Sequence, residues 1–234
     1  MARLLTLAIV LLAALPAGAS NAVSLGYSDR TTIVGPGTDA CASGVLIHDH
    51  DGSFEDAYSW QYGGVLSPYY GAIGEAYDLG AGTIACGAYW LTGLYGYEPP
   101  MAADLYVWEG GVGSAPGAVV SMLPSVQFEG IPQWPTIGEC DVDLGIPVAG
   151  PFTLGYWPIW PGAIADFFCA ADLDGPPGHP WTCIAPGIGY PSGWQDPSIV
   201  WGPTSAMGCG AYFEGDPTPA QSPTWGAIRA MFRR

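Results

Sequence analysis

The chain has 234 residues and a formal net charge of −16, because 21 aspartates and glutamates stand against five arginines and no lysine. Between Arg30 and Arg229 there is no basic side chain, so the body lacks the cations that bind phosphate backbones, and nucleic-acid binding is not expected. A lysine Schiff base is excluded, a P-loop is absent, and such a surface suits a cation, a neutral glycan or solubility outside the cell.

Residues 1–19 have the features of a secretory signal peptide. Arg3 precedes an apolar run over residues 4–15, and Pro16 and the small residues that end at Ala19 follow it. The run is too short to span a bilayer comfortably. The sequence therefore predicts cleavage near Ala19, no membrane span in the remaining chain, and a secreted, cell-surface or periplasmic location.

The remaining chain is predicted to be all-β. Glycine (35 residues) and proline (23 residues) are frequent, and short apolar stretches alternate with turn-forming clusters such as GYEPP and DGPPGHP. This spacing predicts an antiparallel β-sandwich, jelly-roll-like in its connections. In chain order, the expected strands are Val45–His48, Phe54–Tyr62, Ile73–Leu79, Thr83–Leu91, Asp104–Trp108, Ala118–Leu123, Cys140–Leu144, Phe152–Trp157, Ile164–Ala171 and Ala206–Phe213.

The organisation along the chain follows from changes in composition. After the signal peptide, the expected parts are an N-terminal extended segment (20–43), the β-sandwich domain (44–214), a proline-rich linker (215–224) and a basic, aromatic tail (225–234).

Two of these strands alternate clearly. In CDVDLG, Asp141 and Asp143 share one face, and in ADLYVW the side chains of Asp104, Tyr106 and Trp108 do the same. The apolar residues between them point the other way. Each strand is therefore expected to have one wet face and one buried face.

The stretch HDHDGSFE holds the first candidate site. His48, His50 and Glu55 form H-x-H-x4-E, which resembles the first half of the cupin metal motif. That resemblance implies a transition metal in a jelly roll and a metal-dependent enzyme. The second half is not present with its spacing, although His179 follows a Pro-Pro-Gly turn. The alternative is a polar strand start with partly exposed histidines.

The acids of the same stretch offer oxygen ligands, which favour calcium. Asp49, Asp51 and Glu55 surround an Asp-x-Asp-Gly turn, a second Asp-x-Asp-Gly lies at 172–175, and Asp141-x-Asp143 adds a third pair of acids. Calcium takes several carboxylate and carbonyl oxygens, and glycine permits the sharp turn that gathers them. We therefore expect a structural Ca²⁺ at Asp49, Asp51 and Glu55. The alternative is an ordinary Asp-Gly turn, above all at 174–175.

Aromatic side chains form the second candidate site. Ten tryptophans and 13 tyrosines are present, and many of them crowd into residues 156–201. Rings on irregular loops stack against sugars, with help from polar neighbours such as Gln195 and Asp196, although large rings also fill cores. The expected glycan-binding residues are Trp157, Trp160, Tyr190 and Trp194.

All six cysteines follow residue 19, and an even number in an exported chain predicts disulfides. A Cys169–Cys183 bond is favoured, because the turn-rich segment between them folds back easily. Cys86 and Cys209 lie in near-copies, CGAYW and CGAYF, which indicate two similar strands. Other pairings that stay open are Cys41–Cys86 and Cys140–Cys209.

Enzyme motifs are otherwise missing. There is no G-x-S-x-G or H-E-x-x-H, and 21 acids make a chance carboxylate pair uninformative about a glycan hydrolase.

The runs DGSFEDAYSWQYGG and DLYVWEGGVGSAPGAVV, with the ending TWGAIRAMFRR, resemble a group of uncharacterised secreted bacterial proteins. This resemblance implies a β-sandwich and export, and it implies no catalytic residues. The sequence as a whole predicts a non-catalytic surface or extracellular module that binds a glycan or a cell-surface component and holds Ca²⁺. The alternative is a metal-dependent, cupin-like enzyme or a glycan hydrolase.

Overall fold

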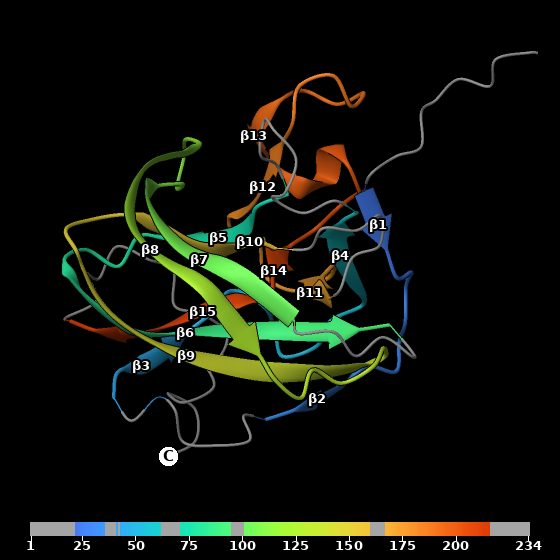
Figure 1. The fold of residues 1–234 in the computed structure, drawn as a ribbon, viewed down its shortest axis with the longest axis horizontal. Coiled ribbons are helices and arrows are strands. Elements are labelled where there is room, and N and C mark those ends of the chain that lie inside the picture. Colours follow the sequence, from blue (N-terminus) through green and yellow to red (C-terminus); the bar gives the residue numbers. More distant parts are fainter. Residues whose placement is uncertain are drawn as a thin grey trace, which may run out of the picture.

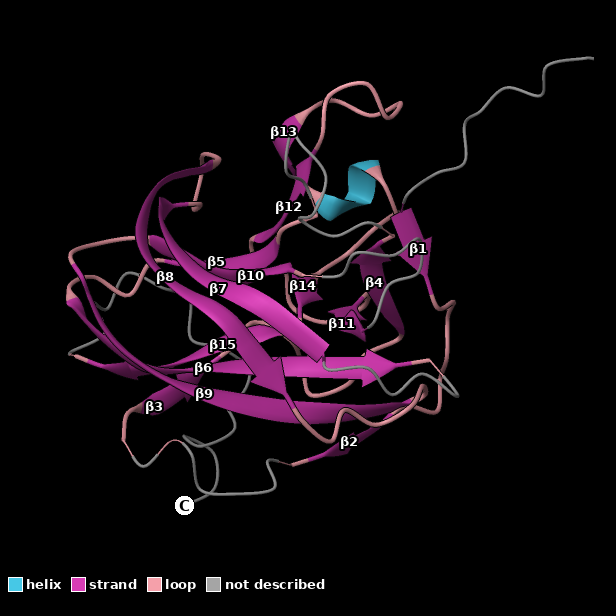
Figure 2. Ribbon diagram, in the orientation of Figure 1, coloured by secondary structure: helices cyan, strands magenta, loops and turns pink. Residues whose placement is uncertain are grey.

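The structure is a computed structural model that describes residues 22–35, 41, 43–61, 71–94, 101–159 and 167–215. Strands make up nearly all of its regular structure (Figure 2), and the described helix is one 3₁₀ turn, η1 (Pro197–Ile199). The strands form two sheets, and all of the pairings between named strands are antiparallel except that of β2 with β9. The predicted all-β fold is therefore confirmed.

The larger sheet has nine strands, and its central path runs β1-β4-β11-β6-β15-β3. The strand β9 pairs along the other edge of β6, β2 pairs with β9, and β14 pairs with β11. The bounds are β1 (Ala22–Ser24), β2 (Thr32–Val34), β3 (Val45–Ile47), β4 (Asp56–Trp60), β6 (Gly82–Gly93), β9 (Thr136–Val148), β11 (Phe167–Asp172), β14 (Ala206–Met207) and β15 (Cys209–Glu214).

The smaller sheet has six strands in the order β13-β12-β5-β10-β7-β8. Figure 1 shows β7 and β8 as a long hairpin in one layer, with the long strands β6 and β9 in the other. The bounds are β5 (Ile73–Tyr77), β7 (Met101–Gly110), β8 (Pro116–Phe128), β10 (Phe152–Pro158), β12 (Pro180–Ile184) and β13 (Gly193–Gln195).

One aromatic-rich core joins the two sheets. Tyr58 and Tyr89 from the nine-stranded sheet, and Leu105, Phe152 and Tyr156 from the six-stranded sheet, are at most 1% exposed and belong to a single cluster. Burying side chains of this size from both inner faces is what holds two sheets together. The two layers therefore form a sandwich.

The near-copies around Cys86 and Cys209 do mark similar strands. In β6 and β15 the two CGAY segments run antiparallel, so that Cys86 lies opposite Tyr212 and Tyr89 lies opposite Cys209. Each copy thus pairs with the other in reverse, and the repeat forms one central ladder of the larger sheet.

Each expected strand has a counterpart, with shifted ends. The strand β8 continues through Pro124, beyond the expected end at Leu123; β8 is an edge strand, where a missing N–H costs little. The expected strand Ala206–Phe213 is split between β14 and β15. The nine-stranded sheet also includes β1 and β2, which come from the expected N-terminal segment.

The signal peptide, the basic tail and all of the expected linker except Gly215 lie outside the described residues. No helix in the described part of the chain is long and apolar enough to cross a membrane.

Candidate functional site

Two Asp-x-Asp-Gly loops meet at one end of the nine-stranded sheet. The first loop precedes β4, and the second follows β11. The main-chain N–H of Asp51 donates to Asp172 Oδ2 at 2.8 Å, and the N–H of Leu173 donates to Glu55 Oε2 at 2.9 Å. Each loop therefore binds a carboxylate of the other, although 121 and 118 residues separate the bonded pairs in sequence.

The junction gathers three carboxylates. Oxygen atoms of Glu55, Asp172 and Asp174 all lie within 4.8 Å of one another. The first two side chains are buried, at 6% and 0% exposure, while Asp174 reaches solvent. Burial raises the pKa of Glu55 and of Asp172, and the neighbouring acids raise both further. We call these three residues the acidic junction.

Hydrogen bonds hold the acidic junction in place. Asp172 Oδ1 accepts the main-chain N–H groups of Asp174 and Gly175, at 3.1 and 2.7 Å. No basic side chain of the described residues neutralises the cluster: Arg30 is the one lysine or arginine within residues 22–215, and its ion pair is an exposed contact with Asp29. The carboxylates are fixed and repel one another, which is the arrangement that a bound cation relieves.

The calcium ligands expected from the sequence are only partly brought together. Glu55 belongs to the acidic junction, but Asp49 and Asp51 do not. Asp51 Oδ1 instead accepts from the N–H and hydroxyl of Ser53, both at 2.8 Å, as in an Asp turn. The second Asp-x-Asp-Gly supplies the other two carboxylates, where an ordinary turn was the favoured expectation.

The histidines do not form the expected metal site. The rings of His48 and His50 stack at 4.0 Å, and the His50 ring lies 4.3 Å from that of Trp90. His50 Nδ1 accepts the Gly52 N–H, and burial, together with the neighbouring His48, lowers the pKa of His50 to about 2. Among the described residues, no group of three converging ligands includes a histidine.

The third histidine faces a hollow and is not part of this ring cluster. His179 is exposed and lines a hollow of about 180 Å³ together with Ser114, Trp181 and Asp196. Of the half-motif that resembles cupins, the two histidines pack against Trp90, and Glu55 belongs to the acidic junction.

A second carboxylate pair lies beside the junction. Glu75 is fully buried on β5 and accepts the N–H groups of His179 and of Met207, the latter at 2.7 Å. A Cβ added to Gly178 would stand 2.6 Å from Glu75 Oε1 and 3.1 Å from Asp49 Oδ2, so both oxygens face this glycine. Burial raises the pKa of Asp49 to about 6, and burial and the charge of Asp49 raise that of Glu75 well above its ordinary value.

The expected sugar platform is a packed cluster. Trp157 and Trp194 are half-buried, with ring centres 6.5 Å apart and planes at 52°. Trp108, expected on a wet face, is 2% exposed between them, and it stacks on Tyr106 at 5.0 Å. Tyr190 packs separately against Trp60, and Trp160 lies outside the described residues. These rings offer no coplanar row for an extended glycan.

The observed disulfide differs from the pairing that the sequence favoured. Cys41 and Cys86 form a disulfide, as one open alternative had it. The Cys169–Cys183 pairing is wrong here, because Cys169 lies on β11 in the larger sheet and Cys183 on β12 in the smaller one. Cys140–Cys209 is also wrong: both lie opposite Tyr89, on its two sides, with β6 between them.

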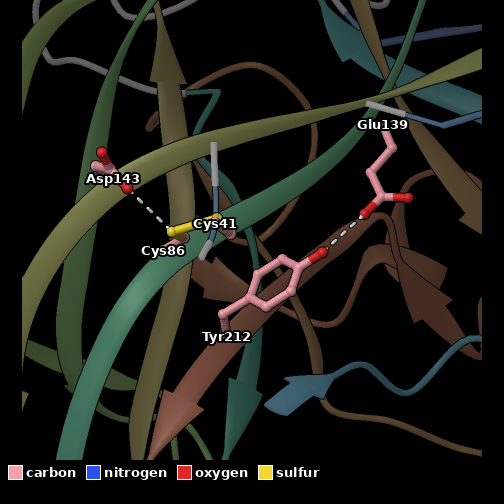
Figure 3. Close-up of a disulfide and its surroundings, with 5 residues drawn as sticks. All are labelled: Cys41, Cys86, Glu139, Asp143 and Tyr212. Atoms are coloured by element: carbon pink, nitrogen blue, oxygen red, sulfur yellow. Dashed lines mark hydrogen bonds between the residues drawn. A yellow bond between two sulfur atoms is a disulfide. The ribbon is translucent and has the colours of Figure 1, made fainter. Parts of the chain in front are cut away.

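Two acids of β9 lie near the Cys41–Cys86 disulfide (Figure 3). Cys86 Sγ lies 3.2 Å from Asp143 Oδ1, and the Tyr212 hydroxyl points to Glu139 Oε1 at 3.4 Å. The two sulfur atoms and Asp143 lie close enough to gather a metal, but the sulfurs are joined to each other. The acidic junction is therefore the better cation site.

Comparison with family models, with curated proteins and with solved structures gave no match for this chain. The resemblance to secreted bacterial proteins stays a prediction.

Sequence reasoning missed Glu75 entirely. Its signal was present, since IGEAY places one carboxylate in an otherwise apolar strand, where an unpaired charge is costly. The joining of the two loops had no comparable signal, because more than a hundred residues separate them.

Proposed function

We propose that this protein is a non-catalytic binding or structural module that acts outside the cytoplasm and holds Ca²⁺ at the acidic junction. The observation that carries the proposal is the convergence of Glu55, Asp172 and Asp174 within 4.8 Å, with no basic partner among the described residues. Carboxylate oxygens on two turns are the ligands that calcium prefers. The Cys41–Cys86 disulfide and the expected signal peptide support a location in an oxidising compartment.

The bound ion would act as a cross-link. Glu55 belongs to the loop before β4, whereas Asp172 and Asp174 belong to the loop after β11. A cation between them replaces mutual repulsion with shared attraction, and it binds only the folded chain. Its stabilising effect then grows with ion concentration, by about 2.7 kcal/mol at a hundred times the dissociation constant.

Thermal unfolding at neutral pH, in excess Ca²⁺ and in EDTA, tests this function. We expect Ca²⁺ to raise the midpoint by about 5–10 °C at a hundred times the dissociation constant. Asp174→Asn should abolish the rise, whereas Asp78→Asn, which removes the same charge on the turn after β5, should keep it. An unchanged midpoint in Ca²⁺, or an equal rise in both variants, would contradict the proposal.

A glycan is the second candidate ligand, and one specific observation favours it. Trp157 and Trp194 keep partly open edges around the buried Trp108, and the polar side chains of Gln195 and Asp196 follow in sequence. Because the rings are not coplanar, the cluster suits one sugar ring rather than an extended chain.

A fluorescence titration against a glycan panel checks this candidate. We expect a panel sugar to change the tryptophan emission, and Trp194→Ala to weaken binding at least tenfold. Tyr190→Phe, in the separate ring cluster, should leave the affinity unchanged. If no sugar binds, or if Trp194→Ala binds as well as the wild type, the aromatic cluster is packing alone.

A further inference from the structure

Two cysteines face each other in the core between the sheets. Cys169 and Cys209 are both 0% exposed, and their Sγ atoms are 3.9 Å apart. Neither belongs to the Cys41–Cys86 disulfide. A contact of this kind between two thiols brings together the atoms that a disulfide would join.

The backbone brings the two cysteines to one strand junction. Along β6, Cys169 of β11 pairs with Leu91, and Cys209 of β15 pairs with Tyr89, two residues away. The two cysteines are therefore neighbours at the point where β15 follows β11 along β6. The Gly208 N–H donates to the Ala170 carbonyl at 2.7 Å, so a main-chain hydrogen bond joins the residues beside the two cysteines.

Only the sulfur atoms have to move. A disulfide has an S–S distance of about 2.05 Å, so the two Sγ atoms must approach by about 2 Å. Rotation about the side-chain torsions brings them together, because the main chains beside the cysteines are already hydrogen-bonded. The other two thiols have no such partner: Cys140 is on β9, and Cys183 is on β12 in the other sheet.

We propose that Cys169 and Cys209 form a second disulfide when the chain folds in an oxidising compartment. The bond would tie β11 to β15 across 40 residues of sequence. It would also fix the strand whose last residue, Asp172, belongs to the acidic junction. This inference stands without bound calcium, because it rests on the position of both cysteines along β6 and on the sulfur contact.

The chemistry is thiol–disulfide exchange with a disulfide of the compartment, R–S–S–R. One cysteine thiolate attacks it, forms a mixed disulfide and releases R–SH; the second thiolate then displaces the other R–SH. The two cysteines lose two electrons and two protons, and the two R–SH molecules carry them. Both thiols are fully buried in the folded chain, so the exchange must occur before the two sheets close over them.

Burial then protects the product. A reductant cannot reach two sulfur atoms between the sheets, and burial raises the pKa of the Cys209 thiol, which disfavours the reactive thiolate. We expect the second bond to resist reductant in the native protein and to open only when denaturant is added.

Counting thiols in the oxidised protein tests the proposal. The full chain is refolded in a glutathione redox buffer, denatured, alkylated without reductant and digested at acidic residues, because no lysine or arginine separates these cysteines. We expect two alkylated thiols, Cys140 and Cys183, and one cross-linked peptide pair that contains Cys169 and Cys209. Four alkylated thiols, or a cross-link from Cys169 to any other cysteine, would overturn the proposal.

A variant separates the two bonds. In Cys41→Ala/Cys86→Ala, four cysteines remain, and we again expect two alkylated thiols and the same cross-linked peptides. The cross-link should be missing in Cys169→Ala/Cys209→Ala but kept in Cys183→Ala. Four alkylated thiols in the first variant, after refolding to the native circular dichroism spectrum, would show that the pair does not join.

Discussion

Adjacent residues at the start of the candidate site respond to pH in opposite directions. Burial raises the pKa of Asp49 to about 6 and lowers that of His50 to about 2. Between pH 3.8 and 6, Asp49 is ionised in the unfolded chain but protonated in the folded one, so the free energy of unfolding falls as pH rises. Between pH 2 and 6.5, His50 is charged in the unfolded chain but neutral in the folded one. Its contribution to the free energy of unfolding therefore falls as pH drops.

Replacing Asp49 measures its contribution to the pH dependence of the free energy of unfolding. Asp49→Asn should match the wild type near pH 3.5 and exceed its free energy of unfolding by about 1–3 kcal/mol at pH 7, because a shift of one pKa unit is worth about 1.4 kcal/mol. Urea unfolding in EDTA at several pH values between 3.5 and 7 measures the difference. A gap that does not change with pH would show that Asp49 is not perturbed in the folded state.

At the scale of the strands, the fold could be predicted because its signals are local. Short apolar stretches between turn residues identify β5, β6 and β10, and in the alternating strand β9 Val142 and Leu144 contact the core as expected. The short strands β12 and β13 were not predicted, because PWTCI and GWQ lie in a segment rich in proline, glycine and aromatic residues. There, pairing with neighbouring strands decides the structure rather than propensity.

Glycines in the middle of the six-stranded sheet set how closely β5 and β10 approach. Gly155 lies opposite Gly74, and a Cβ on Gly155 would stand 2.1 Å from the Ile73 carbonyl oxygen. Because this neighbour is backbone, it cannot move without parting the strands. The absence of side chains here is therefore a requirement of the ladder.

We expect Gly155→Ala to lower the free energy of unfolding by about 2–3 kcal/mol in urea or thermal unfolding. Gly150→Ala is the matched control, since an added Cβ there meets nothing within 4 Å, and its effect should stay within about 0.5 kcal/mol. Equal stabilities of the two variants would mean that the β5–β10 ladder tolerates a wider spacing.

At the scale of the whole molecule, the candidate site is a product of topology. The sequence marks both Asp-x-Asp-Gly turns, but the antiparallel pairing of β4 with β11 brings Glu55 beside Asp172. Only long-range pairing makes that contact, which is why the sequence predicted calcium with Asp49 and Asp51 as ligands. The same pairing joins the first half of the chain to the second, and the bound ion would reinforce it.

Isothermal titration of the metal-free protein with Ca²⁺ at neutral pH tests the acidic junction most directly. We expect one Ca²⁺ per chain in the wild type and in Asp78→Asn, and no measurable binding in Glu55→Gln or Asp174→Asn. The proposed calcium site would be contradicted by a wild type that binds no Ca²⁺, or by junction variants that bind it with unchanged affinity.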